Sequence, residues 1–350
     1  KAVAIDLDNT LYSGVLGEDG INNILITKEH IILQKFLKEL INQGIFLILI
    51  SKNEIEDVNK LFNERKDFLL KIDDFSHLEV SWEEKCKGIQ RSAEKLRISE
   101  NAIVFIDDNI GELSSIWLNN SSFKAIHAKE NALLTVNALR FYPGIWRWNI
   151  DNNDHLRAKD MSGNIQREMI LNNSKNVENY LSSLHVELIY NYNLKSEFKR
   201  LFELSRKTNQ FNFSLRRTSE YEFYEFVKSE SYNIVSVSLK DTISNSGIIA
   251  VIVAKKSGNY IDIIDLCISC RALGRKLEEL IIFPSIINMS FFKDINYVKF
   301  HLNKGPRNKP AIEWMNRFSE NVNGISNISK DRIIKETSML KSIKFIFNYG

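Results

Sequence analysis

The stretch Val3-Ala4-Ile5-Asp6-Leu7-Asp8-Asn9-Thr10-Leu11 places two carboxylates and a hydroxyl at alternating positions after a short apolar run. Residues two apart in a strand point to the same face, so we expect Asp6 and Asp8 to point the same way. Two like charges this close are costly unless a cation such as Mg²⁺ neutralises them. One carboxylate could then attack phosphorus while the other moves protons. The stretch therefore predicts phosphoryl transfer, with an acidic turn after a strand as the plain alternative. A calcium-binding EF-hand loop is not expected, because Leu11 and Gly17 stand where it needs Gly and Glu.

Polar groups also end two other apolar runs. Residues 45–50 are closed by Ser51-Lys52-Asn53, and residues 103–106 are closed by Asp107-Asp108-Asn109. Open α/β sheets bind ligands at the carboxyl ends of their strands, so we expect these groups to share one site. Between them, Lys85 opens a helical stretch and could bind a transferring phosphoryl group, or be an ordinary solvated helix charge.

This layout resembles the haloacid dehalogenase (HAD) superfamily of Mg²⁺-dependent aspartyl phosphotransferases. The resemblance implies that Asp6 is the nucleophile and Asp8 the general acid/base. It implies a Mg²⁺ ion held by carboxylates drawn from Asp6, Asp8, Asp107 and Asp108, without deciding which of the last two touches the metal. The implied phosphate-binding residues are Thr10, Ser51, Lys52, Asn53 and Lys85.

Composition limits the class of protein. The 350 residues suggest two domains, and a hydrophobic content of 44% suffices for two buried cores. The net charge is only +3, and its basic residues are interspersed with acids, so nucleic acid is not an expected partner. No apolar run reaches the roughly 18 residues of a membrane helix, and no signal peptide opens the chain, so no membrane partner is expected either. Three cysteines fit a reducing cytoplasm.

The chain divides by pattern into three parts. Residues 1–130 alternate apolar runs with helical periodicity, which is typical of a parallel α/β sheet. Residues 131–183 are polar and helical, and we interpret them as a connector. Residues 184–350 are predicted to form an α+β domain. Its expected strands are 185–192, 232–239, 247–254, 260–267 and 297–302, and its expected helices are about 195–208, 219–229, 273–289 and 307–318.

The pair Cys267 and Cys270 lies in the predicted junction between a strand and a helix. Zinc would need about four ligands, but the only other cysteine is Cys86. A thioredoxin-type redox pair would have different surroundings from these Arg-rich ones. Two ordinary buried thiols are one interpretation. The other is that Cys270 is a nucleophile, because Arg271 and the start of a helix would both lower its pKa.

Several motifs together resemble the FkbH-like family, which fuses a HAD domain without a large cap to a GNAT-like domain. They are the sequence from Asp6 to Gly20, Ser51-Lys-Asn53, Phe105-Ile-Asp-Asp-Asn109, Arg206-Lys-Thr-Asn-Gln-Phe-Asn212 and Ser269-Cys-Arg-Ala-Leu-Gly-Arg275. The resemblance runs from residue 2 to about 320. It implies a Rossmann-like HAD domain followed by a GNAT-like α+β domain.

The same resemblance implies glyceryl transferase/phosphatase activity. The glyceryl unit of 1,3-bisphosphoglycerate would lose phosphate and pass, through a thioester on Cys270, to the phosphopantetheine thiol of an acyl carrier protein. Candidate substrate-binding residues in the second half are Arg206, Thr208, Asn209, Gln210, Asn212, Arg271, Arg275 and Asn308. A capped helix followed by a polar loop would also explain the cluster at 206–212. A small-molecule phosphatase with a partner-binding second domain is the main alternative function, and a carrier-docking scaffold is the third.

Overall fold

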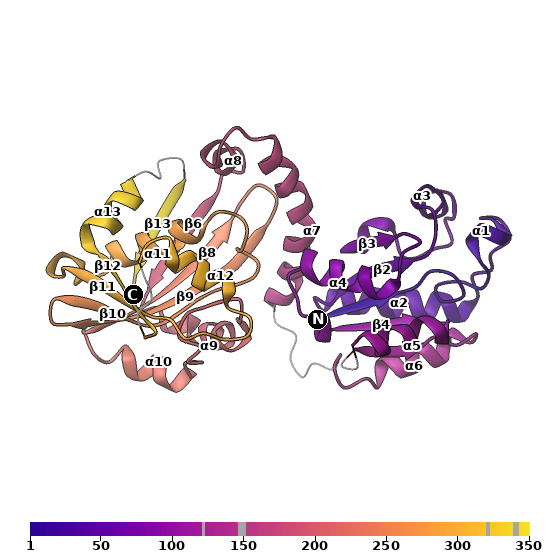
Figure 1. Ribbon diagram of the computed structural model, residues 1–350, viewed down its shortest axis with the longest axis horizontal. Coiled ribbons are helices and arrows are strands. Elements are labelled where there is room, and N and C mark those ends of the chain that lie inside the picture. Colours follow the sequence, from indigo (N-terminus) through magenta and orange to yellow (C-terminus); the bar gives the residue numbers. More distant parts are fainter. Residues whose placement is uncertain (121–122, 146–151, 320–322, 339–342) are drawn as a thin grey trace. The chain divides into compact units, whose positions relative to one another are not determined.

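The computed structural model describes residues 1–120, 123–145, 152–319, 323–338 and 343–350. The chain forms two compact units, Lys1–Ser162 and Gly163–Gly350 (Figure 1). The division falls within the predicted connector, 131–183. None of the helices in the described ranges is both long enough and apolar enough to span a membrane.

The first unit is built on a parallel five-stranded sheet. Its strands are β1 (Ala2–Ile5), β2 (Phe46–Ser51), β3 (His77–Val80), β4 (Ile103–Asp107) and β5 (Lys124–His127), in the order β3-β2-β1-β4-β5. All four neighbouring pairs are parallel. The chain builds outward from β1 to β3 and then crosses to β4, so the order reverses between β1 and β4. Ligands of such sheets bind at the carboxyl ends beside this reversal.

Helices cover both faces of this sheet. They are α1 (Leu16–Asp19), α2 (Lys28–Asn42), α3 (Ile55–Glu64), α4 (Lys85–Lys95), α5 (Ile110–Asn119) and α6 (Ala132–Arg140), with 3-10 turns at Ile72–Asp74 and Glu100–Ala102. Because alternate strand residues face opposite sides, Val3 and Ile5 join the core with α2, α3 and α6, while Ala2 and Ala4 join the core with α4 and α5. Between β1 and α2 the chain forms only the four-residue α1, so no large cap is inserted there.

The second unit is a mixed sheet. Its main strands are β6 (Glu187–Tyr192), β8 (Tyr232–Lys240), β9 (Asn245–Ser257), β10 (Tyr260–Ile268), β11 (Tyr297–His301), β12 (Ile325–Ser329) and β13 (Lys344–Tyr349). They follow the order β12-β11-β10-β9-β8-β6-β13, and the short β7 (Phe211–Asn212) also pairs with β10. The pairs β10–β11 and β6–β13 are parallel and the others antiparallel. β11 pairs with the first half of β10 and β7 with its last two residues.

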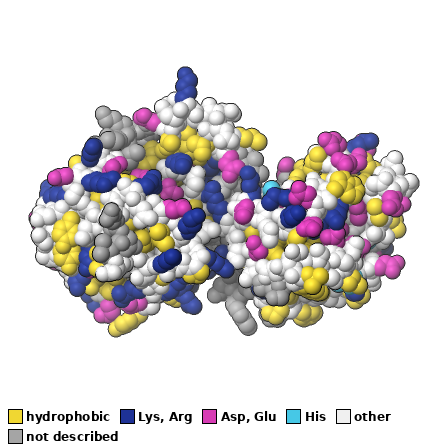
Figure 2. Space-filling model, viewed as in Figure 1, with side chains coloured by type: hydrophobic (Ala, Val, Ile, Leu, Met, Phe, Trp, Pro, Cys, Tyr) yellow, Lys and Arg dark blue, Asp and Glu magenta, His cyan; other side chains and the backbone are white. Residues whose placement is uncertain are grey.

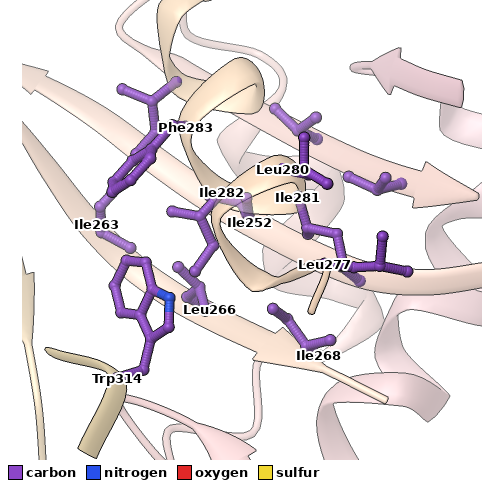
Figure 3. Close-up of a cluster of buried hydrophobic side chains, with 14 of the residues drawn as sticks. Ile252, Ile263, Leu266, Ile268, Leu277, Leu280, Ile281, Ile282, Phe283 and Trp314 are labelled. Carbon is purple, nitrogen blue, oxygen red and sulfur yellow. The ribbon is translucent and has the colours of Figure 1, made fainter. Parts of the chain in front are cut away.

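The helices of this unit are α7 (Asn152–Asn173, shared with the first unit), α8 (Val177–Ser183), α9 (Phe198–Lys207), α10 (Glu220–Phe226), α11 (Glu278–Ile287), α12 (Lys309–Asn316) and α13 (Lys330–Ser338). Short 3-10 turns occur at Lys195–Glu197 and Phe292–Asp294. α11 is buried along most of its length, and its Leu280 and Phe283 pack with Ile263 and Leu266 of β10 and with Trp314 of α12 (Figure 3). α9 packs on the other face, against Val251, Val253 and Cys267.

The predicted fold class is confirmed: a parallel α/β unit is followed by a mixed-sheet α+β unit. The five strands expected in the second half are present as β6, β8, β9, β10 and β11. The helix expected at 273–289 is shorter than predicted, because it begins only at Glu278. The interspersed charges expected from composition are visible on the first unit in Figure 2, where Asp and Glu side chains alternate with Lys and Arg.

Candidate functional site

The carboxyl ends of β1, β2 and β4 deliver the polar groups of the first unit to one place. Asp6 follows β1, Ser51 ends β2 and Asp107 ends β4. The backbone N–H of Asp6 donates to the carbonyl of Ile106 (2.9 Å), which extends the pairing of β1 with β4 as far as these aspartates. Continuous apolar strands, buried on both sides, therefore place the predicted groups at the reversal of strand order.

Lys85 lies inside this group, at the start of α4. Its ammonium contacts Asp6 Oδ1 at 2.9 Å and Asp107 Oδ2 at 2.7 Å, and its side chain is only 6% exposed. Burial alone would lower the pKa of Lys85, but the carboxylates of Asp6 and Asp107 outweigh burial and raise its pKa. The structure thus excludes the interpretation of Lys85 as a solvated helix charge.

Three carboxylates gather closely enough to hold a metal ion. Asp6, Asp107 and Asp108 each offer an oxygen, and these oxygens lie within 4.8 Å of one another. Burial raises the pKa of Asp6 to about 7, with Asp107 adding to the effect, and burial also raises the pKa of Asp107 and of Asp108. The single positive charge of Lys85 therefore does not neutralise the three carboxylates. Oxygen donors with uncompensated negative charge fit a hard divalent cation such as Mg²⁺.

The carboxylate of Asp8, also predicted to bind the metal, is held by hydrogen bonds of its own. It accepts hydrogen bonds from the Tyr12 hydroxyl, the Leu16 N–H (2.9 Å) and Asn53 Nδ2 (2.8 Å). These three donors hold it apart from the close group of Asp6, Asp107 and Asp108. These bonds fix the orientation of the Asp8 carboxylate beside the cluster.

The predicted phosphate-binding residues of the first unit divide into two sets. Ser51 and Asn53 are buried and bonded to each other (3.0 Å) beside Asp8. The Thr10 hydroxyl is buried and has no hydrogen-bond partner among the residues that the structure describes. A buried unsatisfied hydroxyl is rare and fits a site that a ligand completes. Lys52 instead makes an ion pair with Glu112 (2.6 Å).

A cavity of about 390 Å³ borders the carboxylate cluster. His127 donates from Nε2 to the backbone carbonyl of Asp108 (2.9 Å), and Lys129 donates to its Nδ1 (2.7 Å). Sequence reasoning missed these two residues, because β5 has no continuous apolar run to mark it as a strand. Only the pairing of β5 with β4 in the structure places them beside the cluster. The lining residues are Asn9, Ser13, His30, Asp108, His127, Ala128, Lys129 and Glu130.

The second unit separates the two cysteines of the Cys-x-x-Cys pair. Cys267 is fully buried against α9, and burial, with Asp265 adding to it, raises its pKa well above the usual range. Cys270 is half-buried in the turn after β10, and both thiols are free. The predicted helix start at Cys270 is wrong, since α11 begins at Glu278. A helix N-terminus therefore does not stabilise a thiolate at Cys270.

Arg271 and Arg275 are buried, and they bond to the start of β9 and to Asp241 in the turn before it. Arg271 donates to the carbonyls of Ser246 and Ile248 (2.8 Å to the latter). Arg275 contacts Asp241 at 3.5 Å, and Asp241 also accepts two bonds from the buried Arg167, at 2.8 and 2.9 Å. Both arginines predicted to bind substrate thus hold the protein's own backbone and carboxylate together.

The polar cluster 206–212 and Asn308 form a bonded loop system. Asn212 accepts the Leu215 N–H (2.8 Å), and Asn308 Nδ2 donates to the Asn212 carbonyl (3.0 Å). Asn209 accepts a bond from Arg217, and Thr208 caps α9 and accepts another through its carbonyl (2.5 Å). Arg206 is exposed, with its guanidinium over the Phe202 ring. The elements bring Asn209, Asn212 and Asn308 together, as predicted, but leave Arg206 on the surface.

No protein-family model matches the chain, and no curated protein matches it. Among solved structures, the chain is similar to the N-terminal part of the protein BF1531 from Bacteroides fragilis, which contains a phosphatase domain and was determined in complex with Mg. The identity is 28% and the TM-score 0.39, over 42% of this chain and 42% of that one, so the match spans about two fifths of each.

The second half is similar to acetyltransferase structures. Mutant forms of the spermidine/spermine N-acetyltransferase SpeG from Vibrio cholerae match with 11% identity and a TM-score of 0.32, over 43% of this chain and 98% of that one. A dodecameric spermidine N-acetyltransferase from the same organism matches with 9% identity and a TM-score of 0.31, over the same shares.

The buried Arg167–Asp241 pair predicts a large loss of stability on mutation. Asp241→Ala would leave two guanidinium groups, those of Arg167 and Arg275, without this carboxylate. We expect the free energy of unfolding of the second unit to fall by about 3–5 kcal/mol, measured by urea denaturation.

Asp294→Ala is the matched control, because it breaks an exposed pair with Lys256 and should change stability little. A loss at Asp241 no greater than that at Asp294 would show that the buried pair does not hold the turn.

The carboxylate cluster predicts that Mg²⁺ stabilises the first unit in a pH-dependent way. Because the pKa of Asp6 rises from 3.8 to about 7 on folding, the folded state keeps a proton that the unfolded state loses, and metal-free stability falls as pH rises through this interval. A bound cation favours the ionised form. We therefore expect Mg²⁺ to raise the thermal midpoint more at about pH 8 than at about pH 5.5, where protons compete with it.

The measurement is thermal unfolding in MgCl₂ or EDTA at both pH values. Asp107→Asn should lose the Mg²⁺ effect, whereas Asp67→Asn, which alters an exposed pair with Arg65, should keep it. An equal Mg²⁺ effect at the two pH values would contradict this assignment.

Proposed function

We propose that this protein is a glyceryl transferase/phosphatase. It would take the three-carbon unit of 1,3-bisphosphoglycerate, release phosphate, and deliver the glyceryl group to the phosphopantetheine thiol of an acyl carrier protein. The observation that carries the phosphatase part is the buried group of Asp6, Asp107, Asp108 and Lys85 at the reversal of strand order. The transfer to a carrier rests on the motifs shared with FkbH-like proteins. A cytoplasmic location goes with this proposal.

The first chemistry is hydrolysis of the phosphate ester. Asp6 attacks phosphorus, the ester P–O bond breaks, and Asp8 gives a proton to the departing alkoxide. Water then attacks the aspartyl phosphate while Asp8 takes a proton from it, and inorganic phosphate leaves. Mg²⁺ held by Asp6, Asp107 and Asp108 would neutralise the carboxylates and the phosphoryl oxygens.

The surrounding residues serve this reaction by orientation and charge. Lys85, already 2.9 Å from Asp6 Oδ1, holds the nucleophile and presents a cation to the phosphoryl group. Tyr12, Leu16 and Asn53 hold the carboxylate of Asp8 in one orientation. The buried Thr10 hydroxyl can donate a hydrogen bond to a phosphoryl oxygen. The bordering cavity near Lys129 would hold the rest of the substrate.

The second chemistry is acyl transfer in the GNAT-like unit. The thiolate of Cys270 attacks the carbonyl of the acyl phosphate, the C–O bond to phosphate breaks, and a glyceryl thioester forms. The pantetheine thiolate then attacks this thioester, and Cys270 leaves as thiolate. Cys270 is the cysteine of this unit that solvent reaches, since Cys267 is fully buried.

A plain Mg²⁺-dependent phosphatase is the second candidate function. It is favoured by the surroundings of Cys270, because no helix begins there and Arg271 is committed to the carbonyls of Ser246 and Ile248. In that case the GNAT-like unit would bind a partner without carrying an acyl group. The two candidates share the phosphatase site and differ only at Cys270.

The nucleophile can be tested by substitution. Asp6→Asn should lower phosphate release by more than about a thousandfold, because an amide cannot form the phosphoenzyme. Phosphate release from simple phosphate esters, which contain no acyl phosphate for Cys270 to attack, is the measurement, with circular dichroism to confirm folding. Asp67→Asn is the matched surface control. Undiminished release by Asp6→Asn, or by wild type in EDTA, would refute the assignment.

The acyl carrier can be tested by mass. After incubation with 1,3-bisphosphoglycerate, intact-mass spectrometry should find a glyceryl adduct on wild type, Cys86→Ala and Cys267→Ala, but not on Cys270→Ala. Loading of a carrier protein should be lost with the adduct. Phosphate release without any adduct on wild type would favour the plain phosphatase.

A further inference from the structure

The second unit contains a cleft of about 330 Å³ that is separate from the carboxylate cluster. Two loops that are distant in sequence build it, the segment 205–219 and the segment after β11. They are joined by Asn303, whose N–H donates to the Phe213 carbonyl (2.9 Å) and whose Nδ2 donates to the Ser214 carbonyl (2.7 Å). The lining residues are Asn209, Leu215, Arg217, Gly305, Pro306, Arg307 and Asn308.

Arg217 is held in place by neutral acceptors. Its guanidinium donates to the carbonyls of Ser205 (2.6 Å) and Thr208 (2.5 Å) and to Asn209 Oδ1. Its backbone has φ +63°, and Leu215 has φ +55°, a region that sterics make rare for residues other than glycine. Strained backbone of this kind gathers at binding sites, where the surrounding structure holds it. The positive charge of Arg217 is thus positioned without being neutralised by a direct carboxylate contact.

Both segments carry several basic residues and no acidic ones. The segment 205–219 carries Arg206, Lys207, Arg216 and Arg217, the segment 303–312 carries Lys304, Arg307 and Lys309, and neither contains Asp or Glu. Three of these cations make ion pairs with acids outside the loops, namely Lys207 with Glu203, Arg216 with Glu222 and Lys309 with Glu313. Within the described ranges, Arg206, Arg217, Lys304 and Arg307 make no ion pair, and two of these four line the cleft.

One buried carboxylate, that of Asp265, bonds to the segment 205–219. Asp265 of β10 is fully buried and accepts hydroxyl bonds from Ser205 (3.0 Å), Ser214 (2.9 Å) and Thr218 (2.6 Å). It is not among the residues that line the cleft. The polar side chains among the lining residues are those of Arg217, Arg307, Asn209 and Asn308.

We infer that this cleft binds the phosphate group of a phosphorylated ligand. Guanidinium groups bind phosphate through paired, charge-assisted hydrogen bonds, and the positions of Arg217 and Arg307 present two of them to one cavity. Asn209 accepts from Arg217 through its oxygen, which leaves its Nδ2 donors for the ligand. A cavity of this size holds a phosphate group and a short chain attached to it.

The position of the cleft relates it to the proposed acyl transfer. Asn308 bonds the carbonyl of Asn212 (3.0 Å), and Asn212 pairs with Cys267, three residues before Cys270 on the same chain segment. The phosphate could therefore belong to a pantetheine arm or to a three-carbon substrate. This choice of ligands rests on the proposed function, whereas the phosphate site itself does not.

Calorimetric titration of the full-length chain in EDTA tests the inference without metal at the first site. Inorganic phosphate should bind, and phosphorylated ligands should bind at least about tenfold more tightly than their unphosphorylated forms. The pairs are 3-phosphoglycerate with glycerate, and 4′-phosphopantetheine with pantetheine. The pair with the larger difference identifies the source of the phosphate.

Substitutions locate the binding. Arg307→Ala should weaken phosphate binding about tenfold and cannot disturb packing, because Arg307 is exposed and makes no bond within the described residues. Arg217→Ala should do the same, while the matched controls Lys309→Ala and Arg216→Ala, whose side chains do not line the cleft, should bind like wild type.

Absence of phosphate binding, or equal binding by Arg307→Ala and wild type, would overturn the inference. Release of phosphate dependent on Asp6 is measured separately at the first unit. If the protein releases no phosphate but binds phosphate at the cleft, the proposed phosphatase is refuted and the phosphate site in the cleft is supported. If it releases phosphate but does not bind phosphate at the cleft, the inference about the cleft is refuted and the proposed phosphatase is supported.

Discussion

The ammonium of Lys85 between Asp6 and Asp107 is the interaction on which the first unit's site depends. Buried carboxylates at the ends of adjacent strands repel one another, and burial already disfavours their ionised forms. Lys85 offsets part of this cost by direct contacts of 2.9 and 2.7 Å. The charge that remains uncompensated is the reason a divalent cation fits here. In the proposed reaction, the positioning of Asp6, the binding of Mg²⁺ and the binding of the phosphoryl group would all depend on this one charge cluster.

The second unit contains buried arginine side chains. It buries Arg167, Arg271 and Arg275 by bonding them to Asp241 and to backbone carbonyls, so that these cations hold the β8–β9 turn. Arg217 also donates to carbonyls, but it lines an open cleft beside Arg307. The same residue type thus has two roles, and what distinguishes them is whether the bonded guanidinium still faces a cavity. The cleft with exposed positive charge is the one expected to take an anion.

Sequence reasoning succeeded where chemistry lies at the end of an apolar strand. Asp6, Ser51 and Asp107 follow or end continuous apolar runs, and a parallel sheet brings such ends together by topology alone. It failed where the side chain's partner comes from a distant loop. Arg271 beside Cys270 suggested an activated thiol, but its guanidinium is bonded to Ser246 and Ile248, and α11 begins only at Glu278. His127 and Lys129 were missed because β5 is too polar to be recognised as a strand.

The sequence by itself determined the α/β order of the first half, the α+β character of the second, and the identity of the carboxylates at the strand ends. Local patterns suffice for these because strand period and apolar content act within a few residues. Only the tertiary structure decided that Asp8 bonds to Tyr12 and Asn53 apart from the other three aspartates, that Cys267 is inaccessible while Cys270 is not, and that Arg217 and Arg307 share a cleft. Apart from the local bond between Tyr12 and Asp8, these features depend on contacts between segments far apart in the chain. Packing and buried hydrogen bonds set the geometry of such contacts, which leave no local signature in the sequence.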